Sequence, residues 1–176
     1  QGKRTKDLTK TVHNTGSKES QEVFERQQRY RLMWMDTKYE PGTVKVVAYD
    51  KDGKAVAEKE IHTAGKPHHI ELTADRVQLG ADGKDLSFIN VKVVDKDGNL
   101  CPDATNLIEF KVKGAGDFRA AANGNSISLE PFHEPRMKLF SGQLTAIVQA
   151  GEKAGNIRCE ATSKGVKGAT INISTK

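Results

Sequence analysis

Apolar and polar residues alternate along most of the second half of the chain, as expected for β-strands that bury one face. Ile89, Val91 and Val93 share one such face. The pattern predicts about seven short strands, over residues 70–73, 76–79, 86–94, 107–113, 144–149, 156–162 and 169–174. Short strands separated by turns at regular intervals are typical of an immunoglobulin-like β-sandwich. We therefore expect residues 68–176 to form a sandwich of this kind.

The first half of the chain carries fewer elements. Residues 1–28 are polar, show little hydrophobic periodicity and are expected to form a long leader. After them, alternation predicts about three strands, over residues 29–35, 43–49 and 55–61. Three strands form a small sheet that is only marginally stable alone. We therefore expect residues 1–67 to be a truncated second β-sandwich-like domain.

Asp-Lys-Asp-Gly occurs twice, at residues 50–53 and 95–98. A calcium-binding EF-hand loop also begins with spaced acidic residues, but it needs further oxygen ligands and a closing glutamate. Gly98 stands where the third ligand would be required. Asp-Gly pairs readily adopt the positive φ angles of hairpin turns, so we interpret both segments as turns.

Residues 114–142 are glycine-punctuated, contain two prolines and lie between two regions of clear β pattern. We expect this irregular passage to cross between the two sheets, with Phe132 and Phe140 anchoring it to the sandwich. Its acidic residues invite a catalytic interpretation, because glycosidases use two carboxyl groups about 5–10 Å apart. Nothing in the sequence brings Asp117, Glu130 and Glu134 together, so we expect them to be solvated or paired with cations.

Composition excludes several classes of function. The formal net charge is +5, but the basic excess lies within residues 1–31, whereas a nucleic-acid-binding domain would carry it on its folded part. No apolar run approaches the roughly 18 residues of a membrane-spanning helix. We therefore expect neither a nucleic-acid partner nor a membrane span.

Metal and cysteine chemistry have little support. His68 and His69 are adjacent, so in an extended chain they point to opposite faces and cannot readily bind one ion together. Cys101 and Cys159 are too few for a disulfide framework or a metal cluster. We favour two free thiols over a disulfide and expect no metal and no cofactor.

Residues 120–166 strongly resemble the C-terminal immunoglobulin-like domain of bacterial glycoside hydrolase family 2 enzymes, the β-galactosidase-like proteins of Bacteroides-type bacteria. The matching features are the Asn123-Gly124-Asn125-Ser126 segment, the loop 130–135 and the Leu-Phe-Ser-Gly sequence at 139–142. The family often has Asp after the Asn-Gly pair, where this chain has Asn125.

Residues 31–65 resemble the domain that precedes it in the same enzymes, and we expect the chain to begin inside that domain. The family's two catalytic glutamates lie in an upstream barrel domain, which no part of this chain matches. The resemblance therefore implies a noncatalytic accessory region of a carbohydrate-degrading glycosidase, and it assigns no catalytic residue to this chain. It also implies a periplasmic, cell-surface or secreted location, with the upstream catalytic domain of the same polypeptide as the partner.

Two alternatives stay open, namely an autonomous carbohydrate-binding module and a bacterial surface adhesion module. Aromatic side chains can stack on sugar rings, although Trp34 shares a face with Tyr30 and Leu32 and is expected to pack in a core. The candidate residues for glycan binding or for an interdomain contact are Trp34, Tyr39, Phe132, His133, Glu134 and Arg136.

Overall fold

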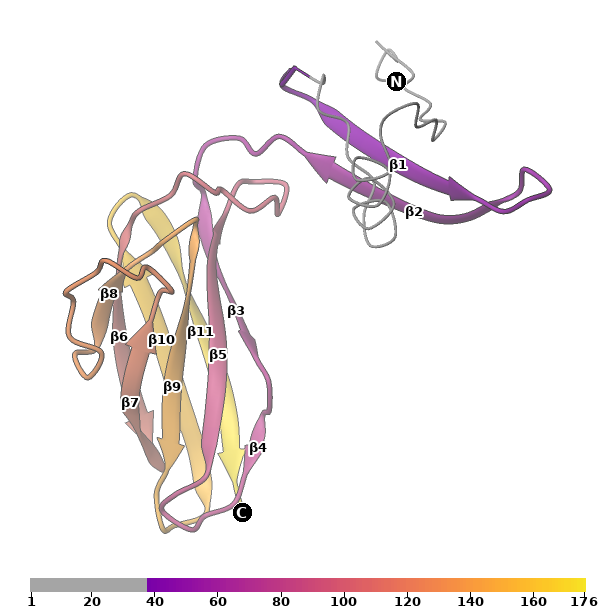
Figure 1. Cartoon of the computed structure of the whole chain (residues 1–176). Coiled ribbons are helices and arrows are strands. Elements are labelled where there is room, and N and C mark those ends of the chain that lie inside the picture. The colour runs from indigo at the N-terminus through magenta and orange to yellow at the C-terminus, as the bar shows by residue number, and fades with distance from the viewer. Residues whose placement is uncertain (1–37) are drawn as a thin grey trace, which may run out of the picture. The chain divides into compact units, whose positions relative to one another are not determined.

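The computed structural model describes residues 38–176, which form β-strands and no helix (Figure 1). No helix long and apolar enough to cross a membrane occurs in this part of the chain. The strands are β1 (Thr43–Tyr49), β2 (Ala55–His62), β3 (His69–Ala74), β4 (Gln78–Leu79), β5 (Leu86–Val94), β6 (Leu107–Gly114), β7 (Gly116–Ala122), β8 (Arg136–Lys138), β9 (Gln143–Ala150), β10 (Gly155–Ser163) and β11 (Val166–Thr175).

Strands β3 to β11 form a sandwich of two sheets (Figure 1). One sheet has the antiparallel order β7-β9-β5-β3, and the other has the antiparallel order β11-β10-β6-β8. The two sheets are joined at β3, which pairs antiparallel with β5 and also pairs in parallel with β11 at His69 and Lys167, and β4 then pairs in parallel with the end of β11. Four strands on one sheet and three on the other is the arrangement of an immunoglobulin constant-type domain. Here β7, β9, β5 and β3 face β11, β10 and β6, and the three-residue β8 is added at the edge beside β6. The predicted all-β, immunoglobulin-like fold is confirmed.

The core lies between the sheets and is built from the inward positions of the alternating strands. Ile89, Val91 and Val93 of β5 are fully buried, as predicted, and so are Ile157, Cys159 and Ala161 of β10. The rings of Phe110 and Phe118 stack across the two sheets, with centroids 5.5 Å apart. The predicted inward faces of β6 and β11 are buried less completely, because Val112, Ala169 and Ile171 stay partly exposed.

Residues 114–142 cross between the sheets as predicted, but the passage is more regular than the sequence suggests. The chain leaves β6 in one sheet, forms β7 on the edge of the other, and returns as β8 beside β6. Both added strands escape pattern analysis for a physical reason. A register shift between Phe118 and Ala120 interrupts the alternation of β7, and β8 spans only three residues.

The predicted anchors of this passage were wrong. Phe132 and Phe140 expose 61% and 45% of their surface. The buried anchors are Met137 and Leu139, which point into the core on either side of an exposed lysine at the end of β8. In a short strand at a sheet edge, the inward positions are set by its pairing with β6, which the sequence does not reveal.

Strands β1 and β2 form an antiparallel hairpin at the predicted positions. Asp50 closes its turn, because its carboxylate accepts the N–H groups of Asp52 and Lys54, both at 2.9 Å. Gly53 takes the expected positive φ of 76°. The predicted strand at residues 29–35 lies outside the described residues, and the division of the chain at residues 67 and 68 stays a prediction.

Candidate functional site

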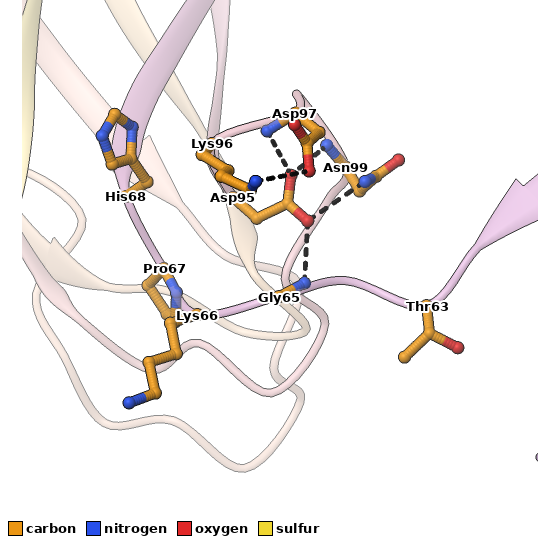
Figure 2. Close-up of a pocket in the computed structure, with 9 residues that line it drawn as sticks. All are labelled: Thr63, Gly65, Lys66, Pro67, His68, Asp95, Lys96, Asp97 and Asn99. Carbon is orange, nitrogen blue, oxygen red and sulfur yellow. Dashed lines mark hydrogen bonds and ion pairs between the residues drawn. The ribbon is translucent and has the colours of Figure 1, made fainter. Parts of the chain in front are cut away.

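The second Asp-Lys-Asp-Gly turn follows β5 and is organised by the carboxylate of Asp95. Its Oδ1 atom accepts the N–H groups of Asp97 at 2.9 Å and Asn99 at 2.8 Å (Figure 2). Gly98 has a φ of 83°, the conformation that glycine adopts most readily. The predicted hairpin turn is confirmed. In a calcium loop the Asp95 carboxylate would coordinate the ion, but here it accepts hydrogen bonds from backbone N–H groups.

The other oxygen of Asp95 fastens the segment that leads into β3. Oδ2 accepts the N–H of Gly65 at 2.7 Å and the side-chain amide of Asn99 at 3.0 Å (Figure 2). These hydrogen bonds, the one from Gly65 above all, hold the pKa of Asp95 well below its ordinary value. Asp95 exposes only 2% of its surface. Its carboxylate is a fixed structural anchor whose acceptor sites already face protein donors.

A hollow lies beside this anchor, lined by Thr63, Gly65, Lys66, Pro67, His68, Asp95, Lys96, Asp97 and Asn99 (Figure 2). Lys66 and His68 are exposed, whereas the carboxylate of Asp95 already accepts hydrogen bonds from its own turn and from Gly65. A ligand site needs polar groups that converge on the space and have unused hydrogen-bonding capacity. The hollow therefore offers few such groups.

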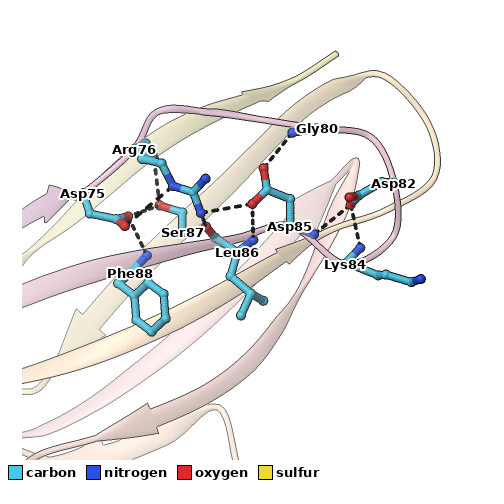
Figure 3. Close-up of polar contacts among 9 residues, drawn as sticks. All are labelled: Asp75, Arg76, Gly80, Asp82, Lys84, Asp85, Leu86, Ser87 and Phe88. Atoms are coloured by element: carbon cyan, nitrogen blue, oxygen red, sulfur yellow. Dashed lines mark hydrogen bonds and ion pairs between the residues drawn. The ribbon is translucent and has the colours of Figure 1, made fainter.

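A second polar cluster fixes the loop between β4 and β5. Asp85 accepts the N–H of Gly80 at 2.9 Å and the guanidinium of Arg76 at 3.0 Å, and Arg76 also donates to the carbonyl of Leu86 (Figure 3). The N–H of Gly80 is the main cause of the lowered pKa of Asp85. Like Asp95, Asp85 therefore stabilises the conformation of a loop, through its hydrogen bond to Gly80 and its ion pair with Arg76.

Asp82 and Asp75 extend this cluster with further backbone contacts (Figure 3). Asp82 accepts the N–H groups of Lys84 and Asp85, each at 2.8 Å, and these bonds lower its pKa. Asp75 accepts the N–H of Phe88 at 2.8 Å. Carboxylates that each hold backbone N–H groups in this way are turn-forming, and the cluster offers no free acid or base pair.

Of the six predicted site residues, Phe132, His133 and Glu134 lie in the loop between β7 and β8, and Arg136 is the first residue of β8. Phe132 and His133 are exposed, and the carboxylate of Glu134 accepts the Nε–H of Arg136 at 2.8 Å. Among these four residues, Glu134 and Arg136 are in direct contact, and the role of the four in binding stays a prediction. Tyr39 lies before β1 and is exposed, and Trp34 is outside the described residues.

Sequence reasoning missed two residues of the same loop. Ile127 and Leu129 expose 84% and 97% of their surface. Their segment alternates apolar and polar residues like a strand, yet no strand forms there. The sequence feature that could have indicated their exposure is the composition of the segment. Asn, Ser and Gly favour turns, and apolar residues in a turn have no strand partner to bury them.

Hydrogen bonds order this loop from within. Asn123 accepts the N–H of Asn125 at 3.0 Å through its side-chain oxygen and donates its amide to the carbonyl of Lys138 at 2.9 Å. Asn125 in turn accepts the N–H of Ile127 at 3.2 Å. The Asn-Gly-Asn-Ser segment is thus a pair of successive side-chain-to-backbone turns, tied to the end of β8.

The three acidic residues considered for catalysis have separate surroundings. Glu130 accepts the N–H of Lys138 at 3.1 Å and the hydroxyl of Ser128 at 3.3 Å. Glu134 is paired with Arg136, and Asp117 is exposed on β7. Across residues 38–176, no group of three or more His, Cys, Asp or Glu side chains is placed to hold a metal ion.

Both cysteines are free and buried. Burial raises the pKa of the Cys159 thiol to about 11, with a smaller contribution from Glu160. Burial also raises the pKa of Cys101, whose Sγ lies 3.7 Å from the carbonyl oxygen of Gly65. At neutral pH both side chains are therefore protonated thiols that act as small core residues, and neither is a ready nucleophile.

Comparison with known proteins identifies the family. The model of glycoside hydrolase family 2 C-terminal domain 5 matches residues 70–172, and that of a domain of unknown function, DUF4982, matches residues 2–57. The β-galactosidase BoGH2A of Bacteroides ovatus is 50% identical over 139 residues, which cover 79% of this chain and 16% of that protein. A β-galactosidase of Thermoanaerobacter pseudethanolicus is 31% identical over 126 residues, covering 71% of this chain and 15% of that protein.

Solved structures agree with this result. A glycosyl hydrolase family 2 member from Bacteroides cellulosilyticus has a TM-score of 0.76 at 34% identity, covering 80% of this chain and 18% of that chain. A β-glycosidase from Bacteroides vulgatus has a TM-score of 0.74 at 26% identity, covering 77% of this chain and 18% of that chain. The chain thus spans about a sixth of the length of the relatives it matches. On the fold, the family model and these relatives together, the chain belongs to the glycoside hydrolase family 2 C-terminal domain 5 family.

Proposed function

We propose that this chain is a noncatalytic accessory region of a family 2 glycosidase of the β-galactosidase type, acting in carbohydrate degradation. The observation that carries the proposal is the match of 50% identity to one part, 16%, of a Bacteroides β-galactosidase. The matching family model is itself described as a C-terminal domain. The role we infer is structural support of the catalytic domain in the same polypeptide.

The surroundings of the acidic residues support a noncatalytic role. Retaining glycosidases place two carboxyl groups about 5 Å apart, one of them poised as an acid by a raised pKa. Here Glu130 is hydrogen-bonded within its own loop and Glu134 is paired with Arg136. Within residues 38–176, hydrogen bonds to backbone N–H groups accompany lowered pKa values of Asp75, Asp82, Asp85 and Asp95. Such groups stay ionised at neutral pH and are poor general acids.

The location and partners follow from the same resemblance. We propose a periplasmic, cell-surface or secreted parent protein, with the upstream catalytic domain as the principal partner and no requirement for a cofactor. Fractionation of the native host followed by detection with an antibody to this chain tests the location. Recovery of the parent from the cytoplasm would contradict it.

The proposed role is tested by assaying the parent polypeptide and the 176-residue chain side by side on nitrophenyl β-galactoside. We expect the parent to release nitrophenol and the chain alone to release none above buffer. Turnover by the chain alone would overturn the noncatalytic assignment. Failure of the parent to hydrolyse any of a panel of nitrophenyl glycosides would overturn the glycosidase assignment.

Glycan binding is the second candidate function, favoured by the exposed ring of Phe132. Calorimetric titration of galactosides and plant polysaccharides into the chain tests it, with Phe132→Ala as the matched variant. Binding at millimolar concentration that is lost in Phe132→Ala would support a carbohydrate-binding module. The same heats in both proteins, or none in either, would rule out a site on this ring.

The sequence upstream of the chain distinguishes an adhesion module from an accessory region of a glycosidase. An array of similar repeats would support it. A barrel domain with paired glutamates would instead support the accessory role.

A further inference from the structure

The surface of the sandwich has one concentration of exposed apolar side chains in a loop. Ile127, Leu129 and Phe132 lie within six residues of the β7–β8 loop, and all three are more exposed than buried. We call them the loop tip. Single exposed apolar residues are common on proteins and need no explanation. Apolar side chains that gather on a surface, rather than standing singly, mark interaction sites.

The loop tip is presented by an ordered scaffold. Asn123 and Glu130 both bind the backbone of Lys138, the residue between the buried Met137 and Leu139. The base of the loop is also tied to β7, where Ala121 donates its N–H to the carbonyl of Phe132 at 2.8 Å. A loop fixed in this way loses little conformational entropy when it binds, which favours association.

The chemistry of the loop tip favours a protein surface over a sugar. A sugar site combines an aromatic ring with free hydrogen-bonding groups around it. Two of the three side chains here are aliphatic, and the neighbouring polar groups of Asn125, Ser128 and Glu130 hydrogen-bond within the loop. The Glu134–Arg136 ion pair lies next along the chain. An apolar centre beside charged residues is the usual composition of a protein–protein contact.

The length of the relatives indicates what covers the loop tip. The matched part is 16% of the Bacteroides ovatus relative and 18% of a Bacteroides cellulosilyticus one, so each carries about five times as much polypeptide outside it. A surface in the same polypeptide meets the loop at a high effective concentration, so even a small apolar contact is occupied. We propose that the loop tip docks onto an apolar surface of the remainder of the parent glycosidase chain. This inference rests on the proposed function.

Hydrogen exchange tests the docking directly. Amide exchange of residues 124–133 is measured in the parent polypeptide and in the 176-residue chain under the same conditions. Docking predicts exchange at least ten-fold slower in the parent for the N–H groups around Ile127 and Leu129. Equal rates in the two proteins would overturn the proposal. Protection in the chain alone that grows with its concentration would also overturn it, by showing that a second copy is the partner.

Substitutions supply an independent test in the parent. Ile127→Ser combined with Leu129→Ser removes the aliphatic part of the loop tip. Val77→Ser is the control, since Val77 is also aliphatic and is 59% exposed just before β4. In the isolated chain we expect both variants to keep the wild-type unfolding midpoint. In the parent we expect only the loop-tip variant to speed proteolytic release of the sandwich several-fold. Equal rates for the two variants would refute docking.

These outcomes are distinguishable from failure of the proposed function. If the parent hydrolyses nitrophenyl galactoside but its loop exchanges as fast as in the isolated chain, the docking inference fails and the accessory role stands. If the parent has no glycosidase activity, the proposed function fails whatever the exchange rates show.

Discussion

The β1–β2 hairpin and the sandwich share the same local sequence features and differ in burial. Both alternate apolar and polar residues, and both turn on Asp-Lys-Asp-Gly. Val44 and Val46 of the hairpin are nevertheless exposed, whereas Val91 and Val93 of the sandwich are fully buried. Alternation therefore predicts a strand, but burial depends on a second sheet packed against it.

Within the hairpin, the two faces are chemically distinct. Val44 pairs with Ile61 on one face, and Lys45 forms ion pairs with Glu58 at 2.9 Å and Glu60 at 3.3 Å on the other. The face with Lys45 is mainly charged but includes the half-buried Val47, whereas the other face exposes Val44, Val46 and Ile61, with Lys59 opposite Val46. The hairpin is built like part of a sandwich, while residues 69–175 form a complete one.

Truncation of a core isoleucine should show the largest difference between the regions. Ile157→Ala removes a fully buried side chain from β10 and should lower the free energy of unfolding of the sandwich by about 2–5 kcal/mol. Ile61→Ala removes the same atoms from a side chain that is 64% exposed, and should change it by about 0.5 kcal/mol or less. Urea unfolding followed by circular dichroism measures both. Similar losses in the two variants would mean that the hairpin face is buried.

The glycines of the two regions give a second matched pair. Gly142 and Gly53 have φ angles of 75° and 76°, so alanine is strained by about 1–2 kcal/mol at either position. At Gly142 a Cβ would also lie 2.2 Å from the carbonyl oxygen of Cys101, whereas nothing lies within 4 Å at Gly53. Gly142→Ala should therefore cost about 3 kcal/mol, and Gly53→Ala only the backbone strain. Equal midpoints in urea would contradict the close contact.

The acidic residues that close the two turns provide the third pair. Asp50 binds two N–H groups through one oxygen and is exposed, whereas Asp95 uses both oxygens and also holds Gly65. Asp95→Ala removes the acceptor of three part-buried backbone N–H groups, those of Gly65, Asp97 and Asn99. The decrease in the thermal midpoint caused by Asp95→Ala should be several times the decrease caused by Asp50→Ala. Calorimetry of both variants checks this, and a larger shift for Asp50→Ala would show that the linker contact is unimportant.

The pH dependence of stability is the smallest expected effect. The pKa of Asp95 is lower in the folded protein than the ordinary value of about 3.9 in the unfolded chain. Its ionised form therefore stabilises the fold fully above that ordinary value, and the contribution is lost as the pH falls from about 5 through the folded-state pKa. Asp95→Asn should give a flatter curve of unfolding free energy between about pH 5 and 2.5. Parallel curves for wild type and variant would contradict this role of Asp95.

Much of the fold was predictable because inward positions recur every second residue. Ile89 and Ile157 were assigned to the core from this rule alone, and both turns followed from Asp-Gly. Strands β7 and β8 were missed because a register shift and a length of three residues hide the period. Phe132 was misjudged because size and hydrophobicity do not reveal which way a loop residue points.

Only part of the candidate surface, the residues after Glu130, could be predicted from the sequence. The family resemblance drew attention to the loop at residues 130–135, where Phe132 is exposed and Glu134 pairs with Arg136 at the start of β8. Ile127 and Leu129 emerged only from the structure, because their exposure depends on the Asn123 and Asn125 turns that lift them out of the sheets. The contact between Asp95 and Gly65 joins residues 30 positions apart, and no local pattern encodes it.

We expect the sandwich, with its entry segment held by Asp95, to fold independently of the rest of the chain. Expression of residues 64–176 alone tests this expectation most directly. We expect one cooperative urea transition, with coincident midpoints by circular dichroism and by one-dimensional NMR, since residues 64–176 hold neither Trp nor Tyr for a fluorescence probe. Residues 68–176 should keep this transition at a lower midpoint, because they lack the Gly65 N–H that Asp95 binds. An unfolded or non-cooperative 64–176 chain would contradict the account.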